Sequence, residues 1–138
     1  MKTFVDSTNY PFDLKEDASR FEGSLPNAPG IAGLRASLLL MKQIGFDEIH
    51  KAAWNVSGYL IEELRKLPVE LVPCTERDST RSTIVSFRPS KIEETYATLR
   101  QNNIACSMRC GYIRTGIHGY NTKEEVDQAV SVLKGCLK

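Results

Sequence analysis

One amphipathic stretch, residues 47–67, constrains the fold more than any other part of the sequence. Its apolar side chains recur at steps of three and four, which puts them on one side of an α-helix: Ile49, Ala53, Val56, Leu60, Leu64 and Leu67. Asp47 can cap the start of this helix, and Pro68 ends it. The sequence therefore predicts a helix here with one buried face.

The rest of the chain alternates between further helices and short strands. Two capping boxes, Ser90 with Glu93 and Thr122 with Glu125, indicate where two of the helices begin. The pattern predicts helices over residues 31–44, 47–67 and 90–100 and from 122 onward. It predicts strands over 69–74 and 83–89, and one or two strands over 104–117 that are broken at Gly111.

This order is typical of an α+β fold, with a small, mostly antiparallel sheet and helices packed on one face. Residues 1–19 show no sustained period and are expected to form an extended N-terminal arm. Residues 20–138 are expected to form a single α+β domain, because 138 residues suit one core of moderate size.

Charge and hydropathy exclude several classes of protein. The formal net charge of +1 favours neither nucleic acid nor an anionic membrane as a partner. No apolar run approaches the ~18 residues that a membrane span needs, and the first residues lack the apolar core of a signal peptide. We therefore expect a cytoplasmic protein.

The cysteines and histidines do not have the spacing of a metal site or a disulfide framework. No cysteine pair has the CxxC spacing, so no metal site is expected, and the thiols should be reduced in the cytoplasm: Cys74, Cys106, Cys110 and Cys136. Cys106 and Cys110 share strand parity, and the favoured interpretation is that both are buried structural residues. A sulfur-relay role and a catalytic Cys110–His118 pair are weaker alternatives.

Arg114 stands out at the end of a predicted strand, just before a turn at 116–121. A guanidinium there is a planar, permanently charged donor suited to a carboxylate, although the residue and its position alone favour a surface Arg at a strand end. The residues that follow have local roles: Asn121 suits a turn and Thr122 caps a helix.

Two motifs together resemble one enzyme family. RFEGSLPNAPGIAGLRASL at 20–38 and RTGIHGYNTKEEVD at 114–127 are similar to the C-terminal part of class V aminotransferase-type enzymes. That family of fold-type I enzymes depends on pyridoxal phosphate and includes cysteine desulfurases, kynureninase-like enzymes and isopenicillin-N-epimerase-like proteins. The resemblance covers roughly residues 18–138.

The resemblance implies roles for two residues. It implies that Arg114 binds the carboxylate of an amino-acid substrate. It also implies that Ser24 contacts the cofactor phosphate across a homodimer. The family has a phosphate-binding threonine at this point of the motif, and Ser24 aligns with that threonine if one residue is gapped, whereas Leu25 aligns with it without a gap. The short segment between Ile104 and Arg114 leaves no room for the cysteine loop of the desulfurases. This length favours the epimerase or C–S lyase branch.

The family's larger domain, which carries the Schiff-base lysine, lies ahead of the first motif, and nineteen residues before Arg20 are too few for it. Lys51 follows His50, as the cofactor lysine follows a histidine in the family, but the pair falls on a predicted helix face. We therefore expect the chain to bind no pyridoxal phosphate by itself and to be inactive without the larger domain. The alternative is a stand-alone, non-catalytic binding or oligomerisation module.

Overall fold

A computed structural model describes residues 16–21, 23, 25–72 and 80–137. The chain divides into two compact units, Met1–Leu40 and Met41–Lys138, and each is described by itself. The predicted division into an arm at 1–19 and a domain at 20–138 stays a prediction, because most of the arm lies outside the described residues. Within the described ranges, no helix has both the length and the apolar character needed to cross a membrane.

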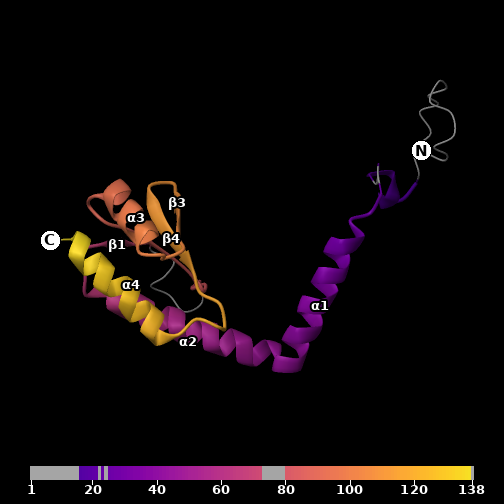
Figure 1. The fold of residues 1–138 in the computed structure, drawn as a ribbon, viewed down its shortest axis with the longest axis horizontal. Helices are drawn as coiled ribbons and strands as arrows, with labels where there is room; N and C mark the ends of the chain where they lie inside the picture. The colour runs from indigo at the N-terminus through magenta and orange to yellow at the C-terminus, as the bar shows by residue number, and fades with distance from the viewer. Residues whose placement is uncertain (1–15, 22, 24, 73–79, 138) are drawn as a thin grey trace, which may run out of the picture. The chain divides into compact units, whose positions relative to one another are not determined.

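The first unit contains a short 3-10 helix, η1 (Ala18–Phe21), and most of helix α1 (Ala28–Ile44) (Figure 1). Helix α1 begins three residues earlier than predicted because Asn27 caps it. The Asn27 Oδ1 atom accepts a hydrogen bond of 3.0 Å from the Gly30 backbone N–H. A Cβ atom at Gly30 would lie 2.5 Å from the Asn27 side chain, which would have to shift to make room for it.

Helix α2 (Phe46–Arg65) confirms the predicted amphipathic helix. Its buried face comprises Ala53, Val56, Ser57, Leu60, Ile61 and Leu64. The predicted cap by Asp47 is wrong. Gly45 occupies the N-cap position at φ 101°, a value that favours glycine, so the chain leaves α1 and restarts as α2 within one residue. Asp47 lies instead in the first turn of α2, where a carboxylate stabilises the positive end of the helix dipole.

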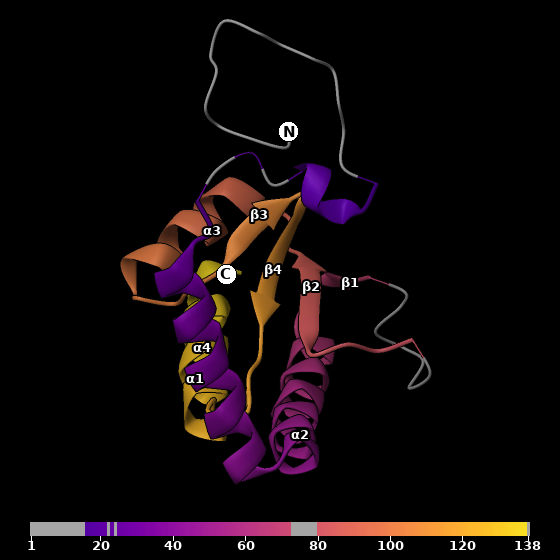
Figure 2. The ribbon, with the colours of Figure 1, turned by 90° about the vertical axis from the view of Figure 1, so that its right-hand side faces the viewer.

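The sheet is antiparallel throughout and has the strand order β1-β2-β4-β3 (Figure 2). Its strands are β1 (Glu70–Leu71), β2 (Ile84–Arg88), β3 (Ser107–Arg109) and β4 (Tyr112–Gly116). The predicted break at Gly111 is confirmed: β3 and β4 form a hairpin whose turn places Cys110 and Gly111 at positive φ. The central strands β2 and β4 therefore have partners on both sides, whereas β1 and β3 form the edges.

Helices α3 (Ile92–Gln101) and α4 (Lys123–Cys136) complete the second unit. Helix α4 packs against both α2 and α3, and Figure 1 shows α2 and α4 side by side. The predicted capping box of Ser90 and Glu93 is wrong. Lys91 is the N-cap residue of α3 and makes no side-chain cap hydrogen bond, so Ser90 lies one position too early to act.

The hydrophobic core lies between the three helices α2, α3 and α4 and one face of the sheet. The sheet contributes Val85, Phe87 and Ile113, each at most 1% exposed. The helices contribute Val56, Leu60, Ile61, Leu64, Leu99, Val126, Val130 and Leu133. Burying one such side chain stabilises the fold by about 1.5–3 kcal/mol. The α+β fold with helices on one face is therefore confirmed.

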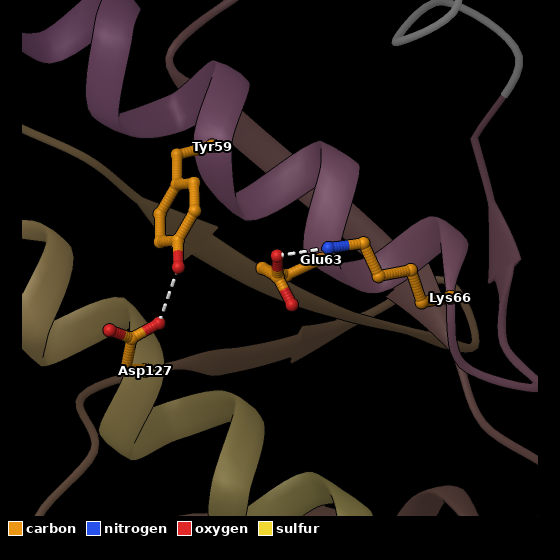
Figure 3. Close-up of polar contacts among 4 residues, drawn as sticks. All are labelled: Tyr59, Glu63, Lys66 and Asp127. Carbon is orange, nitrogen blue, oxygen red and sulfur yellow. Dashed lines mark hydrogen bonds and ion pairs between the residues drawn. The ribbon is translucent and has the colours of Figure 1, made fainter.

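A polar contact also joins α2 to α4 at the surface (Figure 3). The Tyr59 hydroxyl donates a hydrogen bond of 2.7 Å to Oδ1 of Asp127. At the C-terminal end of α2, Glu63 and the C-cap residue Lys66 form an ion pair. The bond to Asp127, followed by desolvation and nearby carboxylates, raises the pKa of Tyr59 to about 12.

We expect the Tyr59–Asp127 bond to make stability depend on alkaline pH. In the unfolded chain the pKa of tyrosine is about 10, whereas in the folded chain the pKa of Tyr59 is about 12. The stabilisation is therefore complete below pH 10 and lost as the pH rises through 12. Urea unfolding of the wild type and Tyr59→Phe should give a constant difference from pH 7 to 9, and that difference should shrink from pH 10 to 12. A difference that stays constant to pH 12 would contradict this assignment.

Candidate functional site

Arg114 lies in the middle of β4, and not at the end of a strand as was predicted. Its register partners are Ser86 on β2 and Ser107 on β3. Because neighbouring residues of a strand point to opposite faces and Ile113 is buried in the core, Arg114 projects from the face that α2, α3 and α4 do not cover. We call this the open face. The Arg114 side chain is half-buried and, among the described residues, forms no hydrogen bond or ion pair.

In the next row along the open face, Glu70, Arg88 and Tyr112 bond to one another, whereas Arg109, the register partner of Tyr112 on β3, is exposed and forms no ion pair among the described residues. Arg88 lies 3.6 Å from the Glu70 carboxylate and donates from Nε to the Gly111 carbonyl at 3.0 Å. The Arg88 guanidinium also lies over the Tyr112 ring at 4.2 Å, and the Tyr112 hydroxyl donates to Glu70 at 2.7 Å. This bond raises the pKa of Tyr112. These contacts join β1, β2 and the hairpin. Arg88 therefore has a carboxylate partner, Glu70, whereas Arg114 has none among the described residues.

The segment after Arg114 turns the chain into α4 through local hydrogen bonds. The backbone N–H of His118 donates to Asn121 Oδ1 at 2.8 Å, and Asn121 Nδ2 donates to Glu125 at 3.0 Å. The predicted capping box is confirmed, because Thr122 Oγ1 accepts from the Glu125 N–H while Glu125 accepts from the Thr122 N–H. The bond from the Asn121 side chain, followed by that from the Thr122 backbone, lowers the pKa of Glu125.

Gly119 is the residue of this turn whose role was missed from the sequence. A Cβ atom at Gly119 would lie 2.9 Å from Cγ2 of Ile49 and 3.0 Å from the Ile49 carbonyl oxygen. The turn can therefore approach the backbone of α2 only with glycine at this position. The His118 ring stacks on that of Tyr120 with a centroid distance of 4.5 Å. One feature of the sequence could have indicated this close approach. Asn121 already serves as the turn residue of the motif, so a glycine at 119 is not needed for the turn itself.

A cavity of about 340 Å³ lies on the opposite side of the sheet from Arg114. Its lining includes Phe87 and Thr115, whose side chains point toward the helices. Three of the polar side chains around it have partners: Thr115 donates to the Val85 carbonyl at 3.2 Å, and Asn121 and Glu125 belong to the α4 cap. This cavity and Arg114 are therefore separate features.

The other candidate residues do not join Arg114. Ser24 lies outside the described residues, so its contact with a cofactor phosphate stays a prediction. His50 and Lys51 are exposed on α2. Among the described residues, no cluster of His, Cys, Asp and Glu could hold a metal ion.

The predicted burial of Cys106 and Cys110 is wrong in one case. Cys110 is exposed because it occupies the hairpin turn. Cys106 packs against the core, where burial raises its pKa, and this half-buried position agrees with a structural role.

The geometry thus defines an α+β unit whose open sheet face presents two guanidinium groups that form no ion pair among the described residues, the half-buried Arg114 and the exposed Arg109. The aminotransferase class V family model matches residues 1–129. The chain belongs to the aminotransferase class V family.

Several known proteins are similar to the chain over most of its length. A probable cysteine desulfurase of Borreliella burgdorferi is 26% identical over 98% of the chain and 36% of the relative. One of Pyrococcus abyssi is 27% identical over 92% of the chain and 35% of the relative. An apo cysteine desulfurase structure from Thermococcus onnurineus NA1 has a TM-score of 0.76 and 25% identity over 91% of the chain and 35% of that structure. The chain thus spans about a third of each of these proteins.

We expect Gly119→Ala to destabilise the fold because the new methyl group would meet the backbone of α2. Overpacking of this kind costs about 1–3 kcal/mol in the free energy of unfolding. Gly116→Ala is the matched control in the same segment, since a Cβ atom there meets nothing within 4 Å, and its effect should stay within about 0.5 kcal/mol. Urea unfolding of the two variants measures the difference. Equal losses would show that the approach to Ile49 is not what requires glycine.

Proposed function

We propose that this chain is the part of a pyridoxal-phosphate-dependent, class V aminotransferase-type enzyme that binds the carboxylate of an amino-acid substrate through Arg114. The observation that carries the proposal is the half-buried guanidinium of Arg114 on the open face, which forms no ion pair among the described residues, whereas Arg88 in the next row has the Glu70 carboxylate. Family membership supports the proposal, and the names of the relatives favour an enzyme that acts on an amino acid.

Arg114 is chemically suited to this role. Its guanidinium offers two parallel N–H donors to the two oxygens of a carboxylate and keeps its charge across the physiological pH range. Because β4 is paired on both sides, the strand holds the start of the side chain in a fixed position. In such an enzyme Arg114 would orient the substrate by its carboxylate, leaving the amino group free to approach the cofactor.

The described residues do not themselves form a site for pyridoxal phosphate. That cofactor takes a lysine amine and stabilises negative charge at the carbon next to the amino group. The described lysines lie on helices or at their ends, none of them on the sheet: Lys42, Lys51, Lys66, Lys91, Lys123 and Lys134. We propose that residues outside the sheet supply the lysine that bonds to the cofactor, and that the described part alone is therefore inactive. We also propose that Ser24 approaches the cofactor phosphate across a homodimer. The reaction subtype among aminotransferase, lyase, epimerase and desulfurase is left open.

A titration can test the role of Arg114 directly. We expect L-alanine to shift the Arg114 side-chain Nε–Hε signal in the ¹⁵N spectrum of the chain. Because one charge-assisted hydrogen-bonded contact contributes about 1.5–3 kcal/mol, the dissociation constant should be on the order of 10–100 mM. L-alaninamide, which keeps the amino group and lacks the carboxylate, should have no such effect.

The control for this titration is a pair of arginine variants. Arg114→Gln should abolish the carboxylate-dependent perturbation of signals around β4, whereas Arg100→Gln, at an exposed position of α3, should leave it unchanged. Equal responses to L-alanine and L-alaninamide, or a response that survives Arg114→Gln, would refute the proposal.

A second function, self-association through α1, is favoured by the exposure of that helix. None of its residues is buried, and Leu34 and Leu38 are 62% and 47% exposed. Contiguous exposed apolar surface commonly marks an interaction site. We propose that α1 promotes homodimer formation, which would also serve a stand-alone binding module.

We expect sedimentation velocity to show a concentration-dependent dimer that the double variant Leu34→Gln/Leu38→Gln disrupts. Glutamine keeps a good helix propensity, so the helix itself should persist. The control is Met108→Gln on β3, an apolar side chain of similar exposure at 43%, which should leave the dimer intact. A wild-type chain that stays monomeric up to high micromolar concentration would exclude this function.

A further inference from the structure

The open face of the sheet contains two adjacent rows that differ in how their polar groups are satisfied. In the first row, Glu70, Arg88 and Tyr112 bond to one another. In the second row, Ser86 and Ser107 flank Arg114 as its register partners. Among the described residues, none of these three side chains forms a hydrogen bond with another residue. The second row therefore has donors available, whereas in the first row, among the described residues, it is the exposed Arg109 on the edge strand β3 that has no bonded partner.

The two serines differ in their surroundings. Ser86 belongs to the central strand β2 and is half-buried, and its carbonyl accepts a bond of 3.2 Å from the Val72 N–H. Ser107 belongs to the edge strand β3 and is exposed. A hydrogen bond to a ligand gains strength where water is partly excluded. An exposed hydroxyl that binds a ligand only replaces its hydrogen bond to water with one to the ligand, so the net gain is small. Ser86 is thus the better placed donor.

We propose that Ser86 is a second carboxylate-binding residue, which acts with Arg114 on the same ligand. Residues directly opposite each other on antiparallel strands have Cβ atoms about 4.5–5.5 Å apart, so one carboxylate can contact both side chains. The guanidinium supplies two donors, and the carboxylate oxygens keep lone pairs that can accept from the Ser86 hydroxyl. The small size of serine also leaves room for the ligand beside the guanidinium.

The charges on the open face support an anionic ligand at this position. Arg88 lies two residues from Ser86 on the same strand and therefore on the same face. Its charge is balanced by Glu70, whereas among the described residues no carboxylate forms an ion pair with Arg114. Ser86 thus lies between two guanidinium groups, of which Arg114 has its charge uncompensated. This inference rests on the proposed function of Arg114 and names the residue that shares its ligand.

The test compares serine variants in the L-alanine titration of the ¹⁵N-labelled chain. Ser86→Ala should raise the dissociation constant about two- to tenfold, which corresponds to the loss of one hydrogen bond. Ser86→Thr keeps the hydroxyl and suits a strand, so it should bind within about twofold of the wild type. Ser107→Ala is the matched control on the other side of Arg114 and should also bind within about twofold of the wild type.

Two results would overturn the inference while leaving the role of Arg114 intact. One is wild-type affinity in Ser86→Ala, and the other is an equal loss in Ser107→Ala. A wild-type chain with no carboxylate-dependent shift at Arg114 would overturn both the inference and the proposed function. Unchanged ligand-free backbone signals in Ser86→Ala, together with weaker binding, would show that the hydroxyl contributes to binding rather than to folding.

Discussion

The pairing of β2 with β4 is the constraint on which the rest of the structure depends. Val85, Phe87 and Ile113 are almost completely excluded from water, and their burial fixes the register that sets Ser86 opposite Arg114. A slip of one residue would turn Arg114 into the core and the apolar side chains outward. The hydrophobic effect on one face of the sheet therefore determines the arrangement of polar groups on the other. Core packing and the candidate site share one cause.

The elements that the sequence predicted well are those with a strong local pattern. Helix α2 shows a sustained helical period, and the α4 cap has both partners of its hydrogen bonds within four residues. The predicted caps at Asp47 and Ser90 failed because the N-cap position lies two residues before Asp47 in one helix and one residue after Ser90 in the other. Gly45 and Lys91 take the N-cap positions, and capping geometry does not tolerate such a shift.

Features that depend on distant segments were not predictable in the same way. The position of Arg114 in a strand followed from local alternation, but its alignment with Ser86 depends on a register between segments almost thirty residues apart. The exposure of Cys110 depends on where the hairpin turns, and parity along one continuous strand gave the wrong answer. The requirement for glycine at 119 arises from Ile49, seventy residues earlier in the chain. In each case the deciding partner is remote in sequence.

The motif at residues 114–127 therefore separates into two parts with different physical roles. After Ile117, the His118 N–H and the side chains of Asn121, Thr122 and Glu125 bond within the turn or the α4 cap, and Gly119 allows the turn to lie against α2. These interactions stabilise the fold, and the buried side-chain atom of this segment without a hydrogen-bond partner among the described residues is His118 Nδ1. Arg114 is different, because no described residue forms an ion pair with it and the core needs only its neighbour Ile113. A half-buried cation without a partner is costly unless a ligand or water compensates it. The binding role that we propose for this motif therefore falls on its first residue, Arg114, and on the strand beside it.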